Sequence, residues 1–209
     1  IGLFLKVFIA DNLSPEVDLI YNNYKNFSSS TLLLGVIGFG IQIYGDFCGY
    51  SLIAIGTAKI IGFNLTNNFD NPYFSSSLTD FWRRWHISLS SFFKDYIYIP
   101  LGGNRRSFFV KNRNLIITFG LSGLWHGANW TFIAWGILHG FFLILQNNFL
   151  KKTSKFFNRI ITIIIVFILW ILFRSESIND FLNYLYLLLK ISPNLPEEGK
   201  NILLFGSYY

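Results

Sequence analysis

The sequence contains no methionine, a single cysteine and few charges, which make up 13% of its 209 residues. An ordinary soluble domain carries about 25% charged residues, so a water-soluble fold of this size would struggle to bury its apolar surface. Cys48 has no second cysteine to pair with, which rules out an internal disulfide. The chain also opens without a methionine, inside an apolar run too short to cross a bilayer. We therefore expect it to be the C-terminal part of a longer protein.

Several well-known chemical motifs are also missing. There is no G-x-S-x-G serine elbow and no G-x-x-x-x-G-K-[ST] phosphate loop. The three histidines, spaced 40 and 13 residues apart, match no familiar zinc pattern, and we expect no metal site. The net charge of +6 could suggest nucleic-acid binding. However, the basic residues lie between apolar runs and accompany no recognised module, so we expect no nucleic acid.

Long apolar runs dominate the sequence, which is 52% hydrophobic and 20% aromatic. A bilayer core about 30 Å thick needs roughly 20 apolar residues of helix to cross it. Runs of sufficient length occupy residues 31–63, 130–150 and 156–173. The expected fold class is all-α, a polytopic transmembrane helical bundle with broken or re-entrant helices, forming one membrane-embedded domain over residues 1–209. Glycines in the first run predict close helix packing.

The segments between these runs differ in charge. Residues 11–30 are polar and partly acidic, and we expect an outside loop or interfacial segment. Residues 64–113 hold seven of the seventeen Lys and Arg, mixed with aromatics, which is typical of the cytoplasmic interface. We expect amphipathic or re-entrant helices there. Residues 181–191 predict a shorter amphipathic or spanning helix.

One basic segment precedes residues 114–150 and a second basic cluster follows them. If both are cytoplasmic, residues 114–150 must leave the cytoplasmic side and return to it. The outward leg, Asn114 to Trp125, would reach about 18 Å as a helix. This length places the joint at residues 126–128 within the membrane, where irregular backbone is tolerated only if protein covers it or it lines a water-filled cavity. His126 is therefore a candidate site residue, and Trp125 could pack against its imidazole.

Histidine chemistry suits acyl transfer. A neutral imidazole with a pKa near 6.5 can accept a proton from a hydroxyl and later release it. Ionisable groups inside membrane spans usually face a site, although each of His86, His126 and His139 could instead be a packing residue. Asp46, inside a glycine-rich apolar run, is the most suggestive carboxylate. The tryptophans near these residues are expected mainly at the membrane interface.

Two elements together point to a family. DFWRRWHISLSSFFKDYIYIPLGGNRR (80–106) and GLWHGANWTFIAWGILHG (123–140) resemble the membrane-bound O-acyltransferase family, in particular its bacterial alginate O-acetyltransferase branch. IQIYGDFCGYSLIAIG (41–56) and FNLTNNFDNPY (63–73) resemble the region that precedes them. Many relatives carry an aspartate where this chain has Leu52, which points to peptidoglycan rather than alginate modification.

The resemblance implies many helices around a central passage, with His126 as the catalytic histidine and His86 as the second family histidine. We expect His126 to act as general base and His86 to position or polarise a substrate. Arginines would shape the cytoplasmic entrance, where those of LGGNRR either meet a phosphorylated donor or anchor the segment. These arginines are Arg83, Arg84, Arg105 and Arg106. Further substrate contacts are expected from Trp125, Asn129 and Asp46.

The function expected is passage of an acetyl group from acetyl-CoA to a hydroxyl of an envelope polysaccharide, of alginate or peptidoglycan type. A periplasmic partner transferase of the serine, glycine, asparagine and histidine (SGNH) hydrolase type could receive it instead. The resemblance implies a multi-pass protein of the bacterial inner membrane, surrounded by lipid. Three alternatives stay open: D-alanyl transfer to teichoic acid, a lipid or sugar transporter, and a non-catalytic scaffold.

Overall fold

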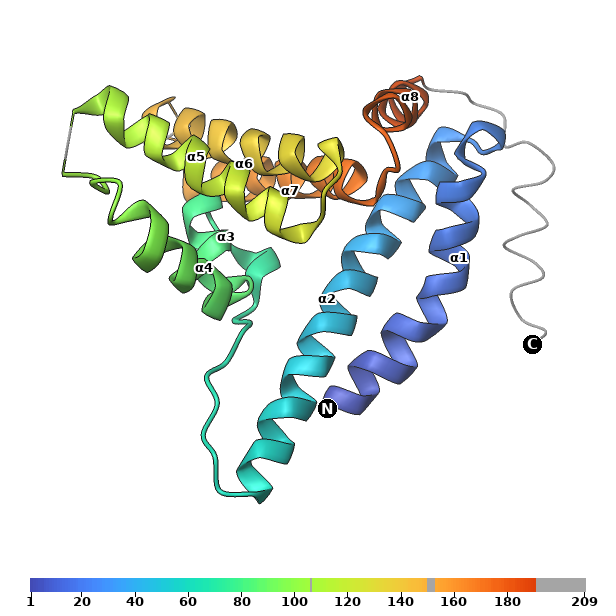
Figure 1. The fold of residues 1–209 in the computed structure, drawn as a ribbon. Coiled ribbons are helices and arrows are strands. Elements are labelled where there is room, and N and C mark those ends of the chain that lie inside the picture. The colour runs from blue at the N-terminus through green and yellow to red at the C-terminus, as the bar shows by residue number, and fades with distance from the viewer. Residues whose placement is uncertain (106, 150–152, 191–209) are drawn as a thin grey trace. The chain divides into compact units, whose positions relative to one another are not determined.

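The structure, a computed structural model, describes residues 1–105, 107–149 and 153–190, and Figure 1 shows them as a ribbon. Within these ranges the secondary structure is helical, apart from one isolated bridge between Phe69 and Trp85. The expected all-α fold class is confirmed. The described residues divide into two compact units, one formed by residues 1–50 with residues 174–190, the other by the described part of residues 51–173.

The first unit begins with a π-helix, η1 (Phe4–Ala10), which continues directly into α1 (Asp11–Asn22). A short 3-10 turn, η2 (Tyr24–Asn26), then leads into the long helix α2 (Ser29–Ile60), which belongs to this unit as far as Tyr50, and α8 (Ile178–Leu189) completes the unit. Of the two alternatives expected for residues 11–30, an outside loop or an interfacial segment, the loop is wrong, because α1 occupies most of this segment. Val17, Ile20 and Tyr21 are buried and follow helical spacing, so they give the polar segment an apolar face.

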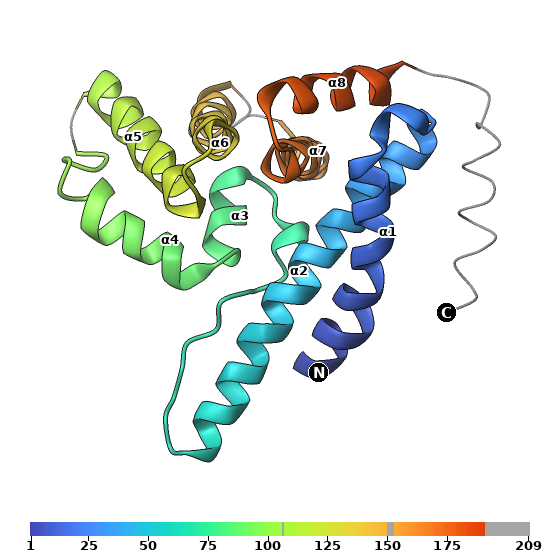
Figure 2. The same cartoon turned by 45° about the vertical axis from the view of Figure 1, so that its right-hand side comes forward.

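Helix α1 lies alongside α2 in both views of the ribbon (Figure 2). Glycines permit this contact and the one between η1 and α2: a Cβ at Gly35 would lie 2.6 Å from Ile20 Cγ2 of α1, and one at Gly49 would lie 2.8 Å from the backbone nitrogen of Lys6 in η1. Close packing at the glycines of α2 is therefore confirmed.

The second unit contains the short helices α3 (Leu78–Arg84) and α4 (Ile87–Phe93), the π-helix η4 (Lys94–Tyr98), and the longer α5 (Phe108–His126), α6 (Trp130–Phe149) and α7 (Lys155–Arg174). Helix α7 ends at the first residue assigned to the other unit. Gln146 fixes α3, because its Oε1 accepts from the Leu78 amide at 2.6 Å while its Nε2 donates to Thr162 Oγ1 at 2.9 Å. One buried amide therefore connects α3, α6 and α7.

Helices α5 and α6 pack closely side by side. A Cβ at Gly123 would overlap the Phe132 carbonyl, and one at Gly136 would overlap the Phe119 carbonyl. The two glycines thus let the two backbones touch at the crossing, as small residues do between membrane helices.

The expected start of the outward leg at Asn114 was wrong. Helix α5 begins at Phe108 and has 19 residues, which corresponds to about 28 Å. Lys111 and Arg113 extend the helix because long basic side chains are good helix formers. The length of this leg therefore no longer places His126 short of the far interface, and a role for His126 must rest on its surroundings.

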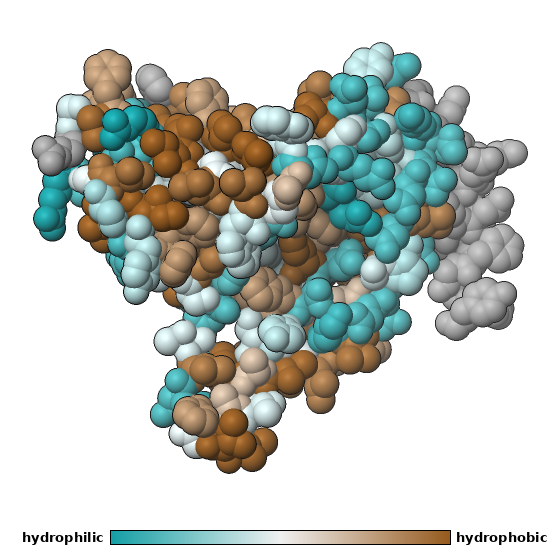
Figure 3. All heavy atoms as spheres, in the orientation of Figure 1, coloured by the Kyte–Doolittle hydropathy of each residue, from teal (hydrophilic) through white to brown (hydrophobic). Residues whose placement is uncertain are grey.

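Three helices are long and apolar enough to cross a membrane by length and composition: Ser29–Ile60, Trp130–Asn148 and Lys155–Arg174. The three predicted apolar runs are confirmed. Apolar side chains remain on the outside of α5 and α6, among them Leu121, Leu124, Ile137 and Phe141, and Figure 3 shows continuous apolar surface over this part of the second unit. Such a surface suits lipid rather than water.

Candidate active site

His86 occupies a sharp turn between α3 and α4. Its φ of 44° and ψ of 58° lie in the left-handed region, which residues other than glycine rarely adopt. Such backbone conformations cost of order 1–3 kcal/mol and persist only where the surroundings enforce them. The turn lies outside the three candidate spans. Burial lowers the pKa of His86 to about 4, so its imidazole is neutral at pH 7.

The segment FNLTNNFDNPY holds this turn in place. Asn68 accepts from the Ile87 amide through its carbonyl at 3.0 Å and from the Ser88 amide through its side-chain oxygen at 3.1 Å. The Asp70 amide donates to the Arg84 carbonyl at 3.0 Å, and Phe69 pairs with Trp85. Resemblance alone had singled out this segment. Its role in the structure is to clamp the backbone on both sides of His86.

His126 is the last residue of α5, directly before the break that separates α5 from α6. A Cβ at Gly127 would lie 2.7 Å from the Phe132 ring, so the close turn of the WHG element needs glycine. Asn129 Oδ1 accepts from the Thr131 amide at 3.2 Å and caps the start of α6. The sequence WHGAN thus ends one helix and begins the next within three residues of His126.

Histidine and tryptophan rings alternate through the second unit. The His86 ring lies 6.2 Å from Trp125, which lies 5.0 Å from His126 between ring centroids. His126 lies 5.2 Å from Trp135, which in turn lies 4.8 Å from His139. His86 and His126 are also close enough to interact electrostatically. The structure therefore brings together the two histidines that the sequence put forward.

His139 has different surroundings. It is 1% exposed and enclosed by Trp82, Trp135 and Phe119. Its Nδ1 has no hydrogen-bond partner among the described residues. This enclosure favours the packing interpretation for His139 over contact with a substrate.

Trp85 and Trp135 are 4% and 1% exposed, so these two tryptophans pack inside the protein. Both pack against Trp170 in an aromatic core: Trp85 is tilted against it at a centroid distance of 5.0 Å, and Trp135 is stacked on it at 6.1 Å. Trp125 and Trp130 are exposed instead. Phe173 on α7 also meets His126 edge to face at 5.1 Å, so this core forms one wall of the histidine's environment.

A cavity of about 810 Å³ lies among α3, α4, α5 and α6. Its lining contains four cationic side chains and no carboxylate among the described residues: Arg83, Lys94, Arg105 and Lys111. Asn114 shapes its rim by donating to the Leu101 and Gly103 carbonyls at 3.0 and 3.3 Å, where Gly102 and Gly103 take positive φ. Trp82 and Phe119 form part of the wall, and no histidine of the described ranges does.

Other predicted site residues lie elsewhere. Arg84 does not line the cavity but pairs with Asp80 at 2.9 Å and approaches Asp70 at 3.9 Å. Arg106 lies outside the described residues. Asp46 belongs to the first unit, where it pairs with Lys6 at 2.7 Å.

Sequence reasoning missed Lys94 and Lys111 as cavity residues and Trp135 as the ring beside His126. The sequence could have indicated Lys111 as a cavity residue, since it lies on the first turn of an apolar helix just after LGGNRR. It could also have indicated Trp135 as part of the histidine's surroundings, because Trp135 and His139 are four residues apart and share a helix face. No cluster of three potential metal-ligating side chains occurs in the part of the chain that the structure describes.

The apolar helices and the histidine pair at helix ends define a helical membrane protein with a polar site inside its helical unit. Residues 1–186 match the membrane-bound O-acyltransferase family, and the chain belongs to this family.

Its similarity extends to several curated proteins. The probable alginate O-acetylase AlgI of Azotobacter vinelandii is 44% identical over 182 residues, covering 85% of this chain and 36% of that protein. The peptidoglycan O-acetyltransferase of Helicobacter pylori is 41% identical over 192 residues, covering 88% and 36%. A teichoic acid D-alanyltransferase of Streptococcus thermophilus is 37% identical over 121 residues, covering 54% and 29%. The chain thus spans just over a third of the length of the two acetylating relatives.

Proposed function

We propose that this chain carries the histidine site of a membrane O-acetyltransferase that transfers an acetyl group to a hydroxyl of a cell-envelope polysaccharide or of a partner protein. The observation that carries the proposal is the pairing of His126, at the break between α5 and α6, with His86, at a strained turn. Family membership supplies the reaction class.

His126 acts as the general base. Its imidazole takes the proton of the acceptor hydroxyl as that oxygen attacks the thioester carbonyl, and the proton then leaves with the thiol of the donor. His86 positions or polarises a substrate, and its neutral imidazole can both donate and accept a hydrogen bond. Trp125 and Asn129 flank the same break and contact the substrate.

The donor is acetyl-CoA, and its phosphates bind in the cationic cavity. Four cations and no carboxylate among the described lining residues suit a polyphosphorylated ligand, because arginine and lysine bind phosphate through charge-assisted hydrogen bonds. Lys94 also has a neighbouring carboxylate outside the lining, Asp95, at 3.8 Å. Arg83 and Arg105 thereby form part of the donor entrance. Asp46 contacts the acceptor only if its partner Lys6 releases it.

The membrane arrangement follows from charge. The basic segment that precedes α5 faces the cytoplasm, and α5 and α6 form the broken hairpin that leaves this side and returns to it. The protein is a multi-pass protein of the bacterial inner membrane. A periplasmic SGNH-type transferase is the partner that passes the acetyl group on to the polymer.

Acetyl transfer is favoured over D-alanyl transfer by the extent of similarity. The acetylating relatives align over 85–88% of the chain, whereas the D-alanyltransferase aligns over 54%.

The test is the O-acetyl content of envelope polymers in cells that carry the full-length gene with His126→Ala, at matched membrane abundance. Phe141→Leu is the control, since Phe141 is exposed on α6 away from the break. Loss of acetyl ester in His126→Ala alone is the expected result. Unchanged acetylation in that variant would favour the scaffold or the transporter instead.

A further inference from the structure

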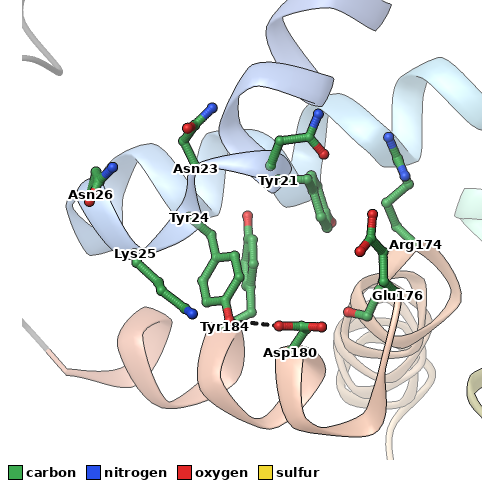
Figure 4. Close-up of a pocket in the computed structure, with 11 residues that line it drawn as sticks. Tyr21, Asn23, Tyr24, Lys25, Asn26, Arg174, Glu176, Asp180 and Tyr184 are labelled. Atoms are coloured by element: carbon green, nitrogen blue, oxygen red, sulfur yellow. Dashed lines mark hydrogen bonds between the residues drawn. The ribbon is translucent and has the colours of Figure 1, made fainter.

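A second cavity, of about 470 Å³, lies entirely within the first unit (Figure 4). It is lined by the end of α1, by η2, by residues 174–176 and by the beginning of α8. Its volume lies within the range of about 300–1,000 Å³ that is typical of small-molecule sites. The catalytic proposal makes no use of this cavity.

The cavity lies at one end of a candidate membrane span. Helix α2 begins at Ser29, three residues after the lining residue Asn26. Leu33 and Leu34 on its second turn are 50% and 52% exposed, so apolar surface begins about 6 Å along the helix axis from Ser29. Exposed apolar side chains on a spanning helix suit lipid. This end of α2 therefore meets the boundary between the headgroups and the apolar core of a bilayer.

Helix α8 gives the cavity a second apolar border. Phe181 and Tyr184 are buried, whereas Leu182, Tyr186 and Leu189 are exposed and share one face of the helix by their spacing. Figure 1 shows α8 end-on while α2 runs across the view, so α8 crosses the end of α2. An amphipathic helix in this orientation suits the interfacial plane of a membrane.

The hydroxyl of Tyr21 points into the cavity (Figure 4). Tyr21 is only 8% exposed, and its Oη has no hydrogen-bond partner among the described residues. Buried polar groups in folded proteins are nearly always hydrogen-bonded. The expected partner of this hydroxyl is therefore an acceptor atom of a ligand in the cavity.

Arg174 lies beside Tyr21 and can bind the same acceptor. Its guanidinium carbon is 5.8 Å from the centroid of the Tyr21 ring. The guanidinium pairs with Asp18 through Nη2 at 2.6 Å, but an arginine has five N–H donors and can serve a second anionic group. Arginine and a neutral hydroxyl together suit a phosphate oxygen.

Asp180 supplies negative charge to the same cavity. Ser177 Oγ donates to Asp180 Oδ2 at 2.6 Å, and Tyr24 Oη donates to Oδ1 at 3.0 Å. These hydrogen bonds, that of Ser177 first, hold the pKa of Asp180 below its usual range, so the carboxylate stays charged. A primary ammonium group, with three N–H donors and no acceptor, suits this carboxylate and the amide oxygens nearby. These amides belong to Asn22, Asn23 and Asn26.

The charges of the described lining residues balance. Lys25 and Arg174 stand against Glu176 and Asp180. An anionic headgroup such as that of phosphatidylglycerol would need an excess of cations. A choline headgroup has no N–H to donate to a carboxylate. A phosphate ester of ethanolamine carries one anionic group and one primary ammonium group, and it matches both signs.

We propose that this cavity binds the zwitterionic headgroup of phosphatidylethanolamine, with the phosphate at Tyr21 and Arg174 and the ammonium group at Asp180. The acyl chains lie along the exposed leucines of α2 and α8. This apolar border favours a membrane lipid over a soluble ethanolamine phosphate ester as the source of the headgroup. The inference does not depend on acetyl transfer.

The experiment is native mass spectrometry of the full-length protein, released from nanodiscs that contain equal parts of phosphatidylethanolamine, phosphatidylcholine and phosphatidylglycerol with the same acyl chains. We expect phosphatidylethanolamine to be retained severalfold more often than either other lipid. Tyr21→Phe and Asp180→Asn should each reduce this preference severalfold. Tyr96→Phe and Asp95→Asn, at exposed side chains of the other unit, are the matched controls and should leave it unchanged. Excess soluble glycerophosphoethanolamine should not displace the retained lipid.

Equal retention of the three lipids, or a preference for phosphatidylglycerol, would overturn the proposal. A preference for phosphatidylethanolamine that both cavity variants leave intact would also overturn it, because the lipid would then bind elsewhere. Displacement by glycerophosphoethanolamine would assign the cavity to a soluble ester, and a folded protein that retains no lipid would point to a protein segment as the occupant. Tyr21→Phe keeps the ring that stacks on Tyr184 at 4.9 Å, so it remains informative if Asp180→Asn folds poorly.

Discussion

The indole of Trp135 meets the imidazole of His126 edge to face, with ring centroids 5.2 Å apart and ring planes at 87°. Trp135 is almost fully buried, and its other contacts include Trp170 and Phe173. A packed ring of this kind fixes the orientation of the histidine beside it. Trp135 is therefore a positioning residue for the proposed general base.

Trp135→Phe should lower kcat for acetyl transfer several-fold and leave KM nearly unchanged, because the substrate still binds while His126 loses its orienting edge. Trp135→Ala should also destabilise the protein, by about 3–5 kcal/mol as for other buried aromatics. The measurements are steady-state kinetics and thermal unfolding in nanodiscs. Trp130→Phe, at a residue 75% exposed, is the control. A rise in KM without loss of kcat would contradict the positioning role.

Gly123→Ala should destabilise the second unit, because the new Cβ would overlap the Phe132 carbonyl where α5 crosses α6. Overpacking of this kind costs typically about 1–3 kcal/mol. Gly56→Ala is the matched control: a Cβ there meets no atom within 4 Å, and removing a helical glycine should stabilise by roughly 0.5–1 kcal/mol. Thermal unfolding of both variants checks the prediction, which fails if they shift the midpoint in the same direction.

The backbone at His86 allows its two roles to be separated. His86→Gly removes the imidazole and suits the left-handed turn, whereas His86→Ala removes the imidazole and keeps a Cβ, which costs roughly 1–2 kcal/mol there. We expect His86→Gly to unfold at a higher temperature than His86→Ala, and both to lose acetyl transfer. If a stable His86→Gly variant retained acetyl transfer, activity would depend on the backbone turn at residue 86 and not on the imidazole.

Much of the fold could be predicted from apolar length alone. The apolar runs that form α2, α6 and α7 are long enough to be recognised as candidate membrane-spanning helices from their own length and composition. Helix α1 was missed because only Val17, Ile20 and Tyr21 make its apolar face, and they are diluted by polar neighbours. The start of α5 was missed because charges at Lys111 and Arg113 look like a loop beside a membrane, although they extend the helix.

The candidate site was only partly predictable. His126 followed from the joint after an apolar run, and His86 from the resemblance, because each stands in a recognisable local motif. The cationic cavity did not follow, since Lys94 and Lys111 are 17 residues apart and only folding brings both to its wall. Arg84 was expected at the entrance, yet Asp80 lies four residues earlier on the same helix face and pairs with it.

Lys6 joins two carboxylates of the first unit, with 2.8 Å to Asp11 and 2.7 Å to Asp46. Asp46 lies 17 residues into α2, or about 25 Å along its axis, far from either helix end. An unpaired charge at such a depth costs about 2.5–3.5 kcal/mol on insertion scales. Lys6 thus compensates a charge that the span would otherwise tolerate poorly.

Lys6→Met should therefore destabilise the protein more than the double variant Lys6→Met with Asp46→Asn, because the second change removes the orphaned charge. The measurement is a double-mutant cycle of unfolding midpoints in nanodiscs, in which contacting residues show a coupling of about 0.5–3 kcal/mol. Asp95→Asn is the control, since Lys94 and Asp95 form an exposed pair at 3.8 Å that contributes at most about 1 kcal/mol. Additive effects of the two changes would mean that Asp46 is solvated independently of Lys6, and Asp46 would then be available to a substrate.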